Sequence, residues 1–391
     1  MNEINRRKFI ASLIGAGVLV NSKLSFGINS SISSLSYWEG NSPFGGEGDR
    51  RFGASKIAQI VAKTMAIDTH NHVDVRIYPD QPLPKYDLLA DFQKSGLAAI
   101  VMTFAVDYQK LQNEGDGYNR FMAGMDAADN LLASYNLKRS VNLSDLKSAF
   151  KKKKPAIIQS VEGGHFLEGK IERLKPAYDR GLRVLGLLHD NDAAVPLGDI
   201  YTKEPFFGGL SPFGTEVLKE CNKLGILVDL THCSNKAIDD ALKISTKPVV
   251  ITHTSLDTQL GKNEKMAQMM KPRLISKEQA KIVANAGGVI GVWRHLTETP
   301  ADYAQNIRAM VDVIGVDNVC IGTDTKITRA TKPNDTSSPR LGELTNGIWQ
   351  NQQSGFFYEV VDAMLKTGFS EKEIIKIGSK NFLKVFDAST K

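Results

Sequence analysis

The sequence predicts an α/β fold, a single (β/α)8 TIM barrel, from three observations. Short aliphatic runs alternate with amphipathic segments, the aliphatic runs number eight, and all 7 histidines lie at or just past the ends of such runs. Apolar strands that alternate with helices are typical of a parallel sheet covered on both faces. Eight such units favour a closed barrel over an open sheet.

The predicted strands are short runs rich in valine, isoleucine and leucine. They cover residues 64–67, 98–104, 156–160, 183–188, 226–230, 249–252, 288–293 and 319–322. Segments with the apolar spacing of amphipathic helices lie between these runs, at residues 132–150, 214–224, 235–244 and 276–286. Together the two patterns predict one catalytic barrel domain over residues 61–391.

The N-terminal residues 1–27 predict an export signal. Arg6, Arg7 and Lys8 precede an apolar run at 11–20 that is too short to span a membrane. Paired arginines before a phenylalanine resemble the twin-arginine type of signal, which indicates a periplasmic or cell-envelope location. An uncleaved membrane anchor is the alternative. Residues 28–60 are expected to be a linker or irregular lead-in, and no stable membrane span is expected after cleavage.

Charge and cysteine content exclude several classes of protein. The formal net charge is +6. The signal contributes +3 of it, from four basic residues against Glu3, so the remainder is too small to indicate a nucleic-acid partner. The 3 cysteines show no C-x-x-C spacing, which argues against a disulfide framework or a structural zinc site. The sequence leaves open whether two of the three cysteines, Cys221, Cys233 and Cys320, form a disulfide.

The histidines point to a metal centre. In a (β/α)8 barrel, residues just past the strands meet at one mouth, where active sites are built. Six side chains of the types that bind zinc lie at these positions: His70, His72, Glu162, His232, His253 and Asp324. His70 and His72 are two residues apart on an extended segment, so both project to one side. Glycines follow Glu162 and let the backbone approach closely, and Glu162 is placed to bridge two metals.

This ligand set predicts hydrolytic chemistry. Two zinc ions that share Glu162 and a water molecule lower the pKa of that water and polarise a carbonyl group. Asp324 is the expected general base and acid, and His189 the expected donor to the developing oxyanion. His165 and His295 are expected either to support the site or to be structural.

Seven motifs in this chain resemble those of a known enzyme family. In chain order they are I-D-T-H-N-H (67–72), V-E-G-G-H (161–165), L-L-H-D (187–190), D-L-T-H-C-S (229–234), I-T-H-T-S (251–255), I-G-T-D (321–324) and N-F-L-K-V-F (381–386). Together they resemble the membrane dipeptidase (renal dipeptidase, peptidase M19) family of the metal-dependent amidohydrolase superfamily. The resemblance runs from residue 66 to the C-terminus.

The resemblance implies a small-molecule substrate, a dipeptide, that is hydrolysed to free amino acids at a two-zinc site. It places His70 and residue 72 on one ion and His232 and His253 on the other, with Glu162 between them. It also implies that the chain can form a homodimer.

The same resemblance implies two substrate contacts. His189 would face the scissile carbonyl. Arg273 would hold the terminal carboxylate of the substrate, because a planar guanidinium suits a carboxylate.

Two positions depart from the family pattern. His72 stands where the family has an aspartate, which leaves the metal pair more positive by one charge. As alternatives, Asp74 takes the ligand position, or the first site is weaker or empty. Lys326 stands two residues after Asp324, where the family has an acidic residue, so the charge of the substrate mouth differs.

Two other functions fit the residues. The first is another amidohydrolase, with one or two metals, that acts on a cyclic amide, a lactone or a related substrate, since H-x-H is also the general superfamily pattern. The second is a non-catalytic metal-binding protein of the cell envelope.

Overall fold

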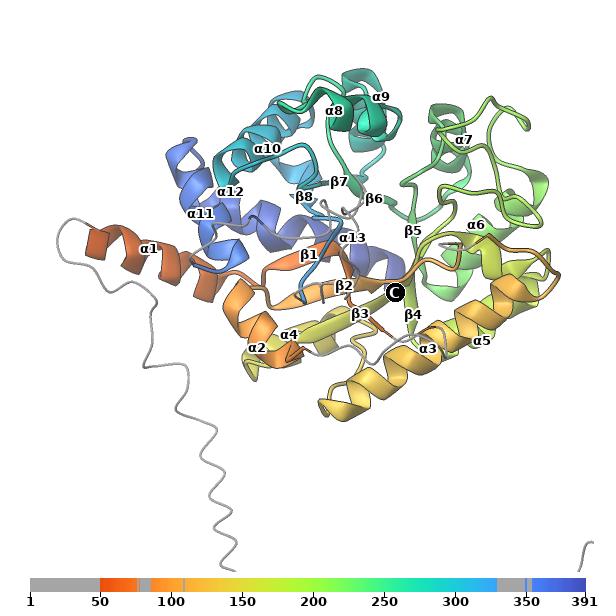
Figure 1. Cartoon of the computed structure of the whole chain (residues 1–391), viewed down its shortest axis with the longest axis horizontal. Coiled ribbons are helices and arrows are strands. Elements are labelled where there is room, and N and C mark those ends of the chain that lie inside the picture. Colours follow the sequence, from red (N-terminus) through yellow and green to blue (C-terminus); the bar gives the residue numbers. More distant parts are fainter. Residues whose placement is uncertain (1–49, 76, 78–85, 108–109, 329–348, 350–353) are drawn as a thin grey trace, which may run out of the picture. The chain divides into compact units, whose positions relative to one another are not determined.

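The computed structural model describes residues 50–75, 77, 86–107, 110–328, 349 and 354–391. The expected signal at 1–27 and residues 28–49 of the expected lead-in therefore lie outside the described residues. Within the described part, nine strands form one parallel sheet that is surrounded by helices (Figure 1). None of the helices described is long and apolar enough to cross a membrane.

The strands are ordered β8-β7-β6-β5-β4-β3-β2-β1-β9 in the sheet. Their bounds are β1 (Ile67–His72), β2 (Ala99–Thr103), β3 (Ala156–Val161), β4 (Leu182–Gly186), β5 (Leu227–Asp229), β6 (Val250–Thr254), β7 (Val289–Val292), β8 (Val319–Ile321) and β9 (Thr325–Lys326). From β1 to β8, strands that follow one another in the sequence lie side by side, as the right-handed βαβ crossover of a barrel requires.

The last stretch of sheet closes the ring. β8 pairs with β7 through Val292 and Ile321, and β9 pairs with β1 through His72 and Lys326. Only residues 322–324 separate β8 from β9, so one short segment joins the two ends of the sheet. The structure thus confirms the predicted (β/α)8 barrel, with its eighth strand broken at the candidate site.

The helices alternate with the strands over most of the chain. Their bounds are α1 (Arg50–Lys63), α2 (Leu88–Ser95), α3 (Asp116–Ser134), α4 (Leu143–Lys151), α5 (Leu174–Asp179), α6 (Pro212–Leu224), α7 (Asn235–Ile244), α8 (Glu264–Met270), α9 (Lys277–Asn285), α10 (Pro300–Ile314), α11 (Phe356–Lys366), α12 (Glu371–Ile375) and α13 (Asn381–Thr390). Three of the four predicted helical segments coincide with α6, α7 and α9.

The fourth predicted helix, 132–150, is wrong in its middle. α3 ends at Ser134, and Asn136 has a φ of 51°, which an α-helix cannot contain. The next helix, α4, begins after Asn142, whose side chain accepts a hydrogen bond from the backbone N–H of Asp145. An N-cap of this kind starts a new helix.

The first predicted strand is also displaced. The strand begins at Ile67 rather than at Thr64, so His70 and His72 lie within β1 instead of after it. All six residues of β1 are buried, although Ile67 is the only apolar residue among them. Asp68 shows how this is tolerated, because its carboxylate accepts hydrogen bonds from the N–H and hydroxyl of Thr323 at 2.8 and 2.6 Å.

The expectation of an irregular lead-in up to residue 60 is wrong for its last part. Residues from Arg50 form α1, and Ile57, Ile60 and Val61 are buried in the main hydrophobic core. The barrel domain therefore begins before residue 61. The helix was missed because serine and glycine just before it suggested a linker.

The barrel interior is filled at its amino-terminal end by the last helix. Aliphatic side chains of the strands pack there against Phe382, Val385 and Phe386 of α13. Full burial of each such side chain stabilises the fold by about 1.5–3 kcal/mol. The N-F-L-K-V-F motif thus closes the end of the barrel opposite to the candidate site. Cys221, Cys233 and Cys320 are free and buried.

Candidate active site

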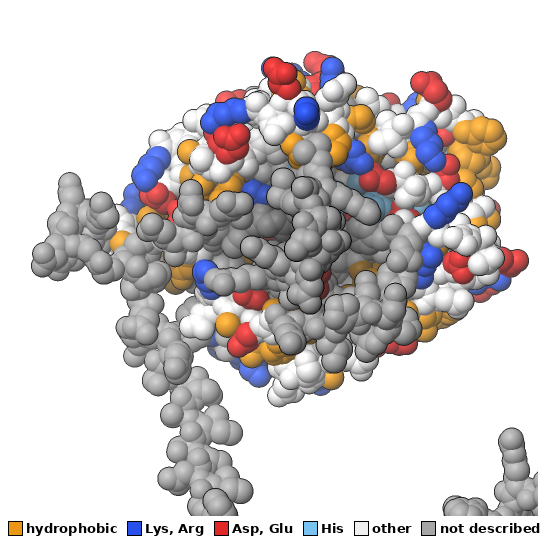
Figure 2. Space-filling view, viewed as in Figure 1, with side chains coloured by type: hydrophobic (Ala, Val, Ile, Leu, Met, Phe, Trp, Pro, Cys, Tyr) orange, Lys and Arg blue, Asp and Glu red, His pale blue; other side chains and the backbone are white. Residues whose placement is uncertain are grey.

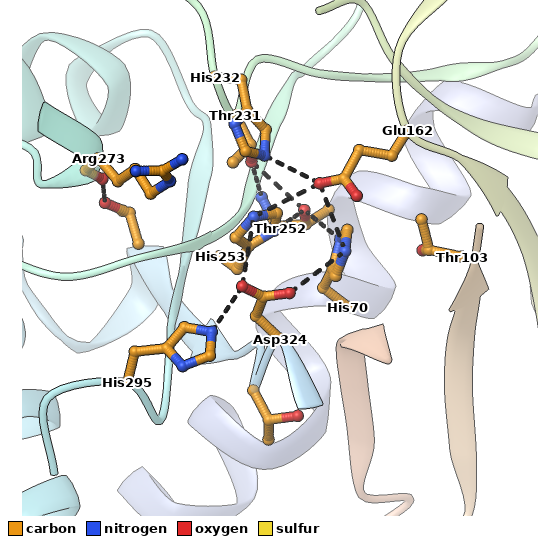
Figure 3. A network of polar contacts seen from close by, with 12 residues as sticks. His70, Thr103, Glu162, Thr231, His232, Thr252, His253, Arg273, His295 and Asp324 are labelled. Carbon is orange, nitrogen blue, oxygen red and sulfur yellow. Dashed lines mark hydrogen bonds and ion pairs between the residues drawn. The ribbon is translucent and has the colours of Figure 1, made fainter. Parts of the chain in front are cut away.

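The predicted ligand side chains converge at the carboxyl ends of the strands. They come from β1 and β6 and from the segments after β3, β5 and β8, and Figure 3 shows five of them facing one another: His70, Glu162, His232, His253 and Asp324. In Figure 2, histidine atoms are visible in a recess on this face, beside acidic side chains.

Glu162 lies at the centre of the cluster. Its Oε1 is 2.9 Å from Nε2 of His232 and 3.6 Å from Nε2 of both His70 and His253. Its Oε2 is 3.3 Å from Nε2 of His189. One buried carboxylate therefore faces imidazoles on several sides, as a ligand shared by two metal positions would.

Asp324 forms the second acidic point of the cluster. Its Oδ1 is 3.2 Å from Nε2 of His72 and 3.8 Å from Nε2 of His70. Its Oδ2 is 2.6 Å from Nε2 of His295. His295, whose role the sequence left open, is thus a direct neighbour of the predicted catalytic aspartate.

Hydrogen bonds fix which imidazole nitrogen faces the cluster. The hydroxyl of Thr252 donates to Asp229 at 2.6 Å, so its oxygen is left to accept from Nδ1–H of His70 and of His253, each at 3.1 Å. His72 likewise directs Nδ1 to the carbonyl of Thr103 at 3.2 Å. All three rings therefore present Nε2 to the site.

The donors fit a divalent metal. The residues form three groups, and within each group the potential ligand atoms all lie within 4.8 Å of one another. The groups are His70, His72 and Glu162; His70, His253 and Asp324; and Glu162, His189 and His232. Nε2 of His70 is buried and has no hydrogen-bond partner among the residues that the structure describes, which is costly for a polar atom unless an ion occupies the space before it. Neutral imidazole and carboxylate are ligands that zinc and related metals take.

The close packing of these groups shifts their pKa values. Burial would raise the pKa of Glu162 and of Asp324, but the surrounding histidines hold both well below the usual carboxyl value. Burial would lower the pKa of His70 and His232, but for His70 the charge of Glu162 raises it to about 9. For His232, hydrogen bonds to Asp190 and Glu162 raise it to about 10. Burial and the neighbouring His70 keep the pKa of His253 well below its usual value.

Two residues of the cluster have a strained backbone. His232 has a φ of 66° and Asp324 a φ of 54°, the left-handed region that residues other than glycine rarely adopt. Such a conformation costs on the order of 1–3 kcal/mol and persists where the surroundings hold it, often at functional sites. For Asp324 it breaks the strand between β8 and β9 and turns the carboxylate to the cluster.

His189 is oriented by an aspartate that the sequence did not single out. Nδ1 of His189 is 2.6 Å from Oδ1 of the buried Asp107, which also accepts from the amide of Asn191 at 3.0 Å. Burial would raise the pKa of Asp107, but the hydrogen bond from His189 lowers it. Asp107 follows β2 by four residues, and nothing but its position after a strand distinguishes it in the sequence.

His165 does not face the cluster. Its Nε2 donates to the carbonyl of Asn191 at 2.8 Å, and its ring packs against the backbone of Gly163. A Cβ at Gly163, whose φ is +84°, would lie 2.2 Å from Nδ1 of His165. This explains the first glycine of E-G-G-H and gives His165 a supporting place.

Arg273 lines a pocket next to the metal ligands. The pocket is also lined by Tyr201, His232, His253 and Trp293. The guanidinium of Arg273 donates through Nη2 to Oδ2 of Asp190 at 2.7 Å. Tyr201 and Asp190 were not predicted as site residues, although Asp190 belongs to the L-L-H-D motif.

His72, rather than Asp74, has its side chain beside His70 in the structure. Asp74 does not enter the cluster, because its Oδ1 binds Nζ of Lys326 at 2.5 Å. His72 does enter it, through Nε2. Both departures from the family pattern are thus linked, since Lys326 pairs with the alternative acidic ligand.

Comparisons with known proteins agree with this site. The family model for membrane dipeptidase (peptidase family M19) matches residues 54–391. A probable dipeptidase, PvdM, from Pseudomonas aeruginosa has a similar structure, with a TM-score of 0.69, 15% identity and coverage of 86% of this chain and 98% of that one. An amidohydrolase from Pseudomonas aeruginosa gives a TM-score of 0.66 at 21% identity, with 85% and 98% covered.

A third similar structure contains a ligand. It is a metallo peptidase from Rhodobacter sphaeroides with a phosphinate mimic of the dipeptide L-Ala-D-Ala, at a TM-score of 0.61 and 17% identity, covering 83% of this chain and 99% of that one. At these identities, the likeness concerns the fold.

Proposed function

This chain belongs to the membrane dipeptidase family (peptidase family M19), and from that premise we propose that it hydrolyses dipeptides to free amino acids with two zinc ions. The observation that carries the proposal is the position of Glu162, whose carboxylate faces His70, His232 and His253 at 2.9–3.6 Å. A carboxylate in this position can serve two metal ions at once.

The six predicted ligands divide into two sets. His70 and His72, with Asp324 close by, would hold the first ion, and His232 and His253 would hold the second. Glu162 would be common to both. The orientation of each Nε2 towards the centre supports this division, as do the ligand groups within 4.8 Å of one another.

The metal supplies one part of the chemistry. When bound, the two ions would lower the pKa of a shared water molecule and polarise the scissile carbonyl.

Asp324 carries the proton. It would accept a proton from the attacking water at a carboxylate oxygen and return it to the leaving nitrogen. Its low pKa means that the carboxylate is ionised at neutral pH and ready to accept. The hydrogen bond from His295 to Oδ2 leaves Oδ1 on the side of His70 and His72.

His189 would stabilise the oxyanion. Its Nδ1–H donates to Asp107, so Nε2 can donate to a substrate oxygen only when the ring carries both protons. Burial would lower the pKa of His189, but the charge of Glu162 and the hydrogen bond to Asp107 raise it, which favours that charged form.

Arg273 would bind the terminal carboxylate of the dipeptide. Its guanidinium lies in the same pocket as His232 and His253, and its pKa is raised, mainly by Tyr201 and Asp190 against the effect of burial. Only one N–H of Nη2 is needed for Asp190, so further N–H groups are left for a bidentate contact.

A dipeptide panel tests the proposal. Dipeptides with a free C-terminal carboxylate should be hydrolysed by the zinc-loaded protein, and a chelator should abolish the activity. The same dipeptides with a C-terminal amide should be poor substrates, and the Arg273→Met variant should lose most of this preference. Equal rates on free and amidated dipeptides would remove the role of Arg273.

A second function is favoured by His72. A histidine at this position gives the H-x-H pattern of the wider amidohydrolase superfamily, whose members also act on cyclic amides, lactones and related substrates. Turnover of such compounds by a protein that cleaves no dipeptide would favour this alternative. Bound zinc without turnover of either class would favour the non-catalytic envelope protein.

The location follows from the N-terminal motif. We propose export to the periplasm or cell envelope by the paired Arg6 and Arg7. Replacement of both by lysine should retain the protein in the cytoplasmic fraction. Unchanged export of that variant would contradict a twin-arginine signal.

A further inference from the structure

Asp190 lies next to His189, four residues after the end of β4, and both of its carboxylate oxygens are engaged at the site. Oδ1 accepts a hydrogen bond from the hydroxyl of Tyr201 at 2.6 Å and lies 3.3 Å from Nδ1 of His232. Oδ2 binds Nη2 of Arg273 at 2.7 Å. One carboxylate therefore joins a proposed metal ligand to the proposed substrate-binding arginine.

The contact to His232 fixes the tautomer of that ring. The hydroxyl of Tyr201 gives its own proton to Asp190 and lies 2.9 Å from Nδ1 of His232. Both neighbours of Nδ1 are then acceptors, so Nδ1 carries a proton, and Nε2, which faces Glu162, is the nitrogen left to bind a metal ion. A carboxylate behind a ligating histidine strengthens metal binding. At other metal sites, loss of such a carboxylate typically lowers metal affinity or activity by about 10- to 100-fold.

The long side chain of Arg273 is restrained by two hydrogen bonds. Besides the bond to Asp190, Nη1 donates to the carbonyl of Met269 at 3.2 Å, and the backbone of Arg273 is held separately, since its carbonyl accepts from the hydroxyl of Thr254 at 2.8 Å. The guanidinium also lies 5.6 Å from the centre of the Tyr201 ring. Of the two side-chain hydrogen bonds, the one with Asp190 joins opposite charges and is therefore the stronger restraint.

We propose that Asp190 is a positioning residue that holds His232 for metal binding and Arg273 for recognition of the substrate carboxylate, an inference that rests on the proposed dipeptidase function. Its two oxygens set the distance between the second metal position and the carboxylate-binding group. That distance selects substrates whose carboxylate lies one residue beyond the scissile bond, as in a dipeptide.

The test compares Asp190→Ala with Asp192→Ala. Asp192 is a suitable control because it lies on the same segment and also pairs with a cation, Nζ of Lys203 at 2.5 Å, but both side chains of this pair are about half exposed. Two quantities are measured: the affinity of the metal-free protein for zinc by calorimetry, and the ratio of kcat/KM on a free dipeptide to kcat/KM on its C-terminal amide at saturating zinc.

We expect Asp190→Ala to weaken zinc binding at one of two sites by about 10- to 100-fold and to lower the free-to-amide ratio by about tenfold or more. Asp192→Ala should stay within about twofold of the wild type in both quantities, because exposed ion pairs contribute little. A residue with only a structural role would lower the rates on both substrates alike and leave their ratio unchanged.

Failure of the inference is distinct from failure of the proposed function. If the wild type shows no preference for the free carboxylate, the role of Arg273 is wrong, and with it the part of the inference that concerns Arg273. The calorimetric measurement then still decides the part that concerns His232. If the wild type has the preference and Asp190→Ala matches Asp192→Ala in ratio and in zinc affinity, the inference is overturned while the proposed function stands.

Discussion

Nε2 of His295 lies 2.6 Å from Oδ2 of Asp324. This distance equals the one between His189 and Asp107, and the other contacts between histidines and acidic residues described at the candidate site are longer. His295 is buried, comes from the segment after β7, and packs edge-on against Trp293 at a ring distance of 5.0 Å. The hydrogen bond occupies one oxygen of Asp324 and leaves the other beside His72 and His70. Asp324 is thereby held in one orientation although its backbone is strained.

Replacement of His295 should therefore reduce catalysis more than substrate binding. We expect His295→Phe to lower kcat by about 10- to 100-fold with little change in KM, because the carboxylate of Asp324 loses its fixed orientation. His295→Gln, whose amide can still donate a hydrogen bond, should lose less. Steady-state kinetics and the Tm of both variants check this. A wild-type kcat in His295→Phe would show that Asp324 does not need this partner.

The variant Asp324→Asn should keep its metal but lose most of its activity. The amide has nearly the same shape as the carboxylate and keeps an oxygen for the metal, but it cannot accept the proton of the attacking water. Loss of a general base typically costs about 10²–10⁴ in rate. Zinc content by elemental analysis and kcat are to be measured on the same sample. A variant with bound zinc and normal rates would mean that another group takes the proton.

His72 and Asp74 offer a direct test of the first metal position. We expect His72→Ala to have a lower affinity than the wild type for one of the two zinc ions, since Nε2 of His72 faces the cluster. Asp74→Asn should bind zinc normally, because Asp74 pairs with Lys326 outside the cluster. The comparison uses zinc titrations of the metal-free proteins. The reverse order of effects would show that the carboxylate replaces the imidazole once metal is bound.

The stabilising effect of zinc should increase with pH between about pH 7 and 10. The pKa values of His70 and His232 are about 9 and about 10 in the folded protein, against about 6.5 in an unfolded chain. A raised pKa stabilises the metal-free fold fully below the unfolded value, and this contribution is lost as the pH rises through the folded value. His253, with its lowered pKa, is neutral throughout this range.

Zinc binds the deprotonated rings, so the loaded protein does not depend on these protons. The Tm of zinc-loaded and zinc-free protein, measured at several pH values, should therefore diverge as the pH rises. A difference that stays constant or shrinks would mean that the two histidines are not protonated in the metal-free fold.

The position of the candidate ligands in the fold could be predicted mainly from the ends of the predicted strands. Apolar runs and the acidic or histidine residues that follow them placed Glu162, His232, His253 and Asp324 at one mouth, because a parallel barrel brings the carboxyl ends of all its strands together. His70 and His72 were assigned to the same mouth although their strand was displaced. The two-residue spacing was sufficient, since it holds within a strand as well as after one.

The supporting residues could not be predicted in the same way. Asp107, Asp190 and Tyr201 act through side-chain contacts between segments that are far apart in the sequence, and no spacing rule connects Asp107 to His189, 82 residues later. The start of the domain was missed for a related reason. α1 is stabilised by packing of Ile57 and Ile60 in the core, and its own sequence carries only a weak amphipathic pattern.

Stepwise addition of zinc to the metal-free protein, with dipeptide hydrolysis followed at each step, is the most direct test of the two-ion site around Glu162. We predict that activity is absent without metal and reaches its maximum at two zinc ions per chain, and that Glu162→Gln reaches neither the stoichiometry nor the rate. Full activity in the presence of a strong chelator, or a maximum at which the second ion is not bound, would contradict the account.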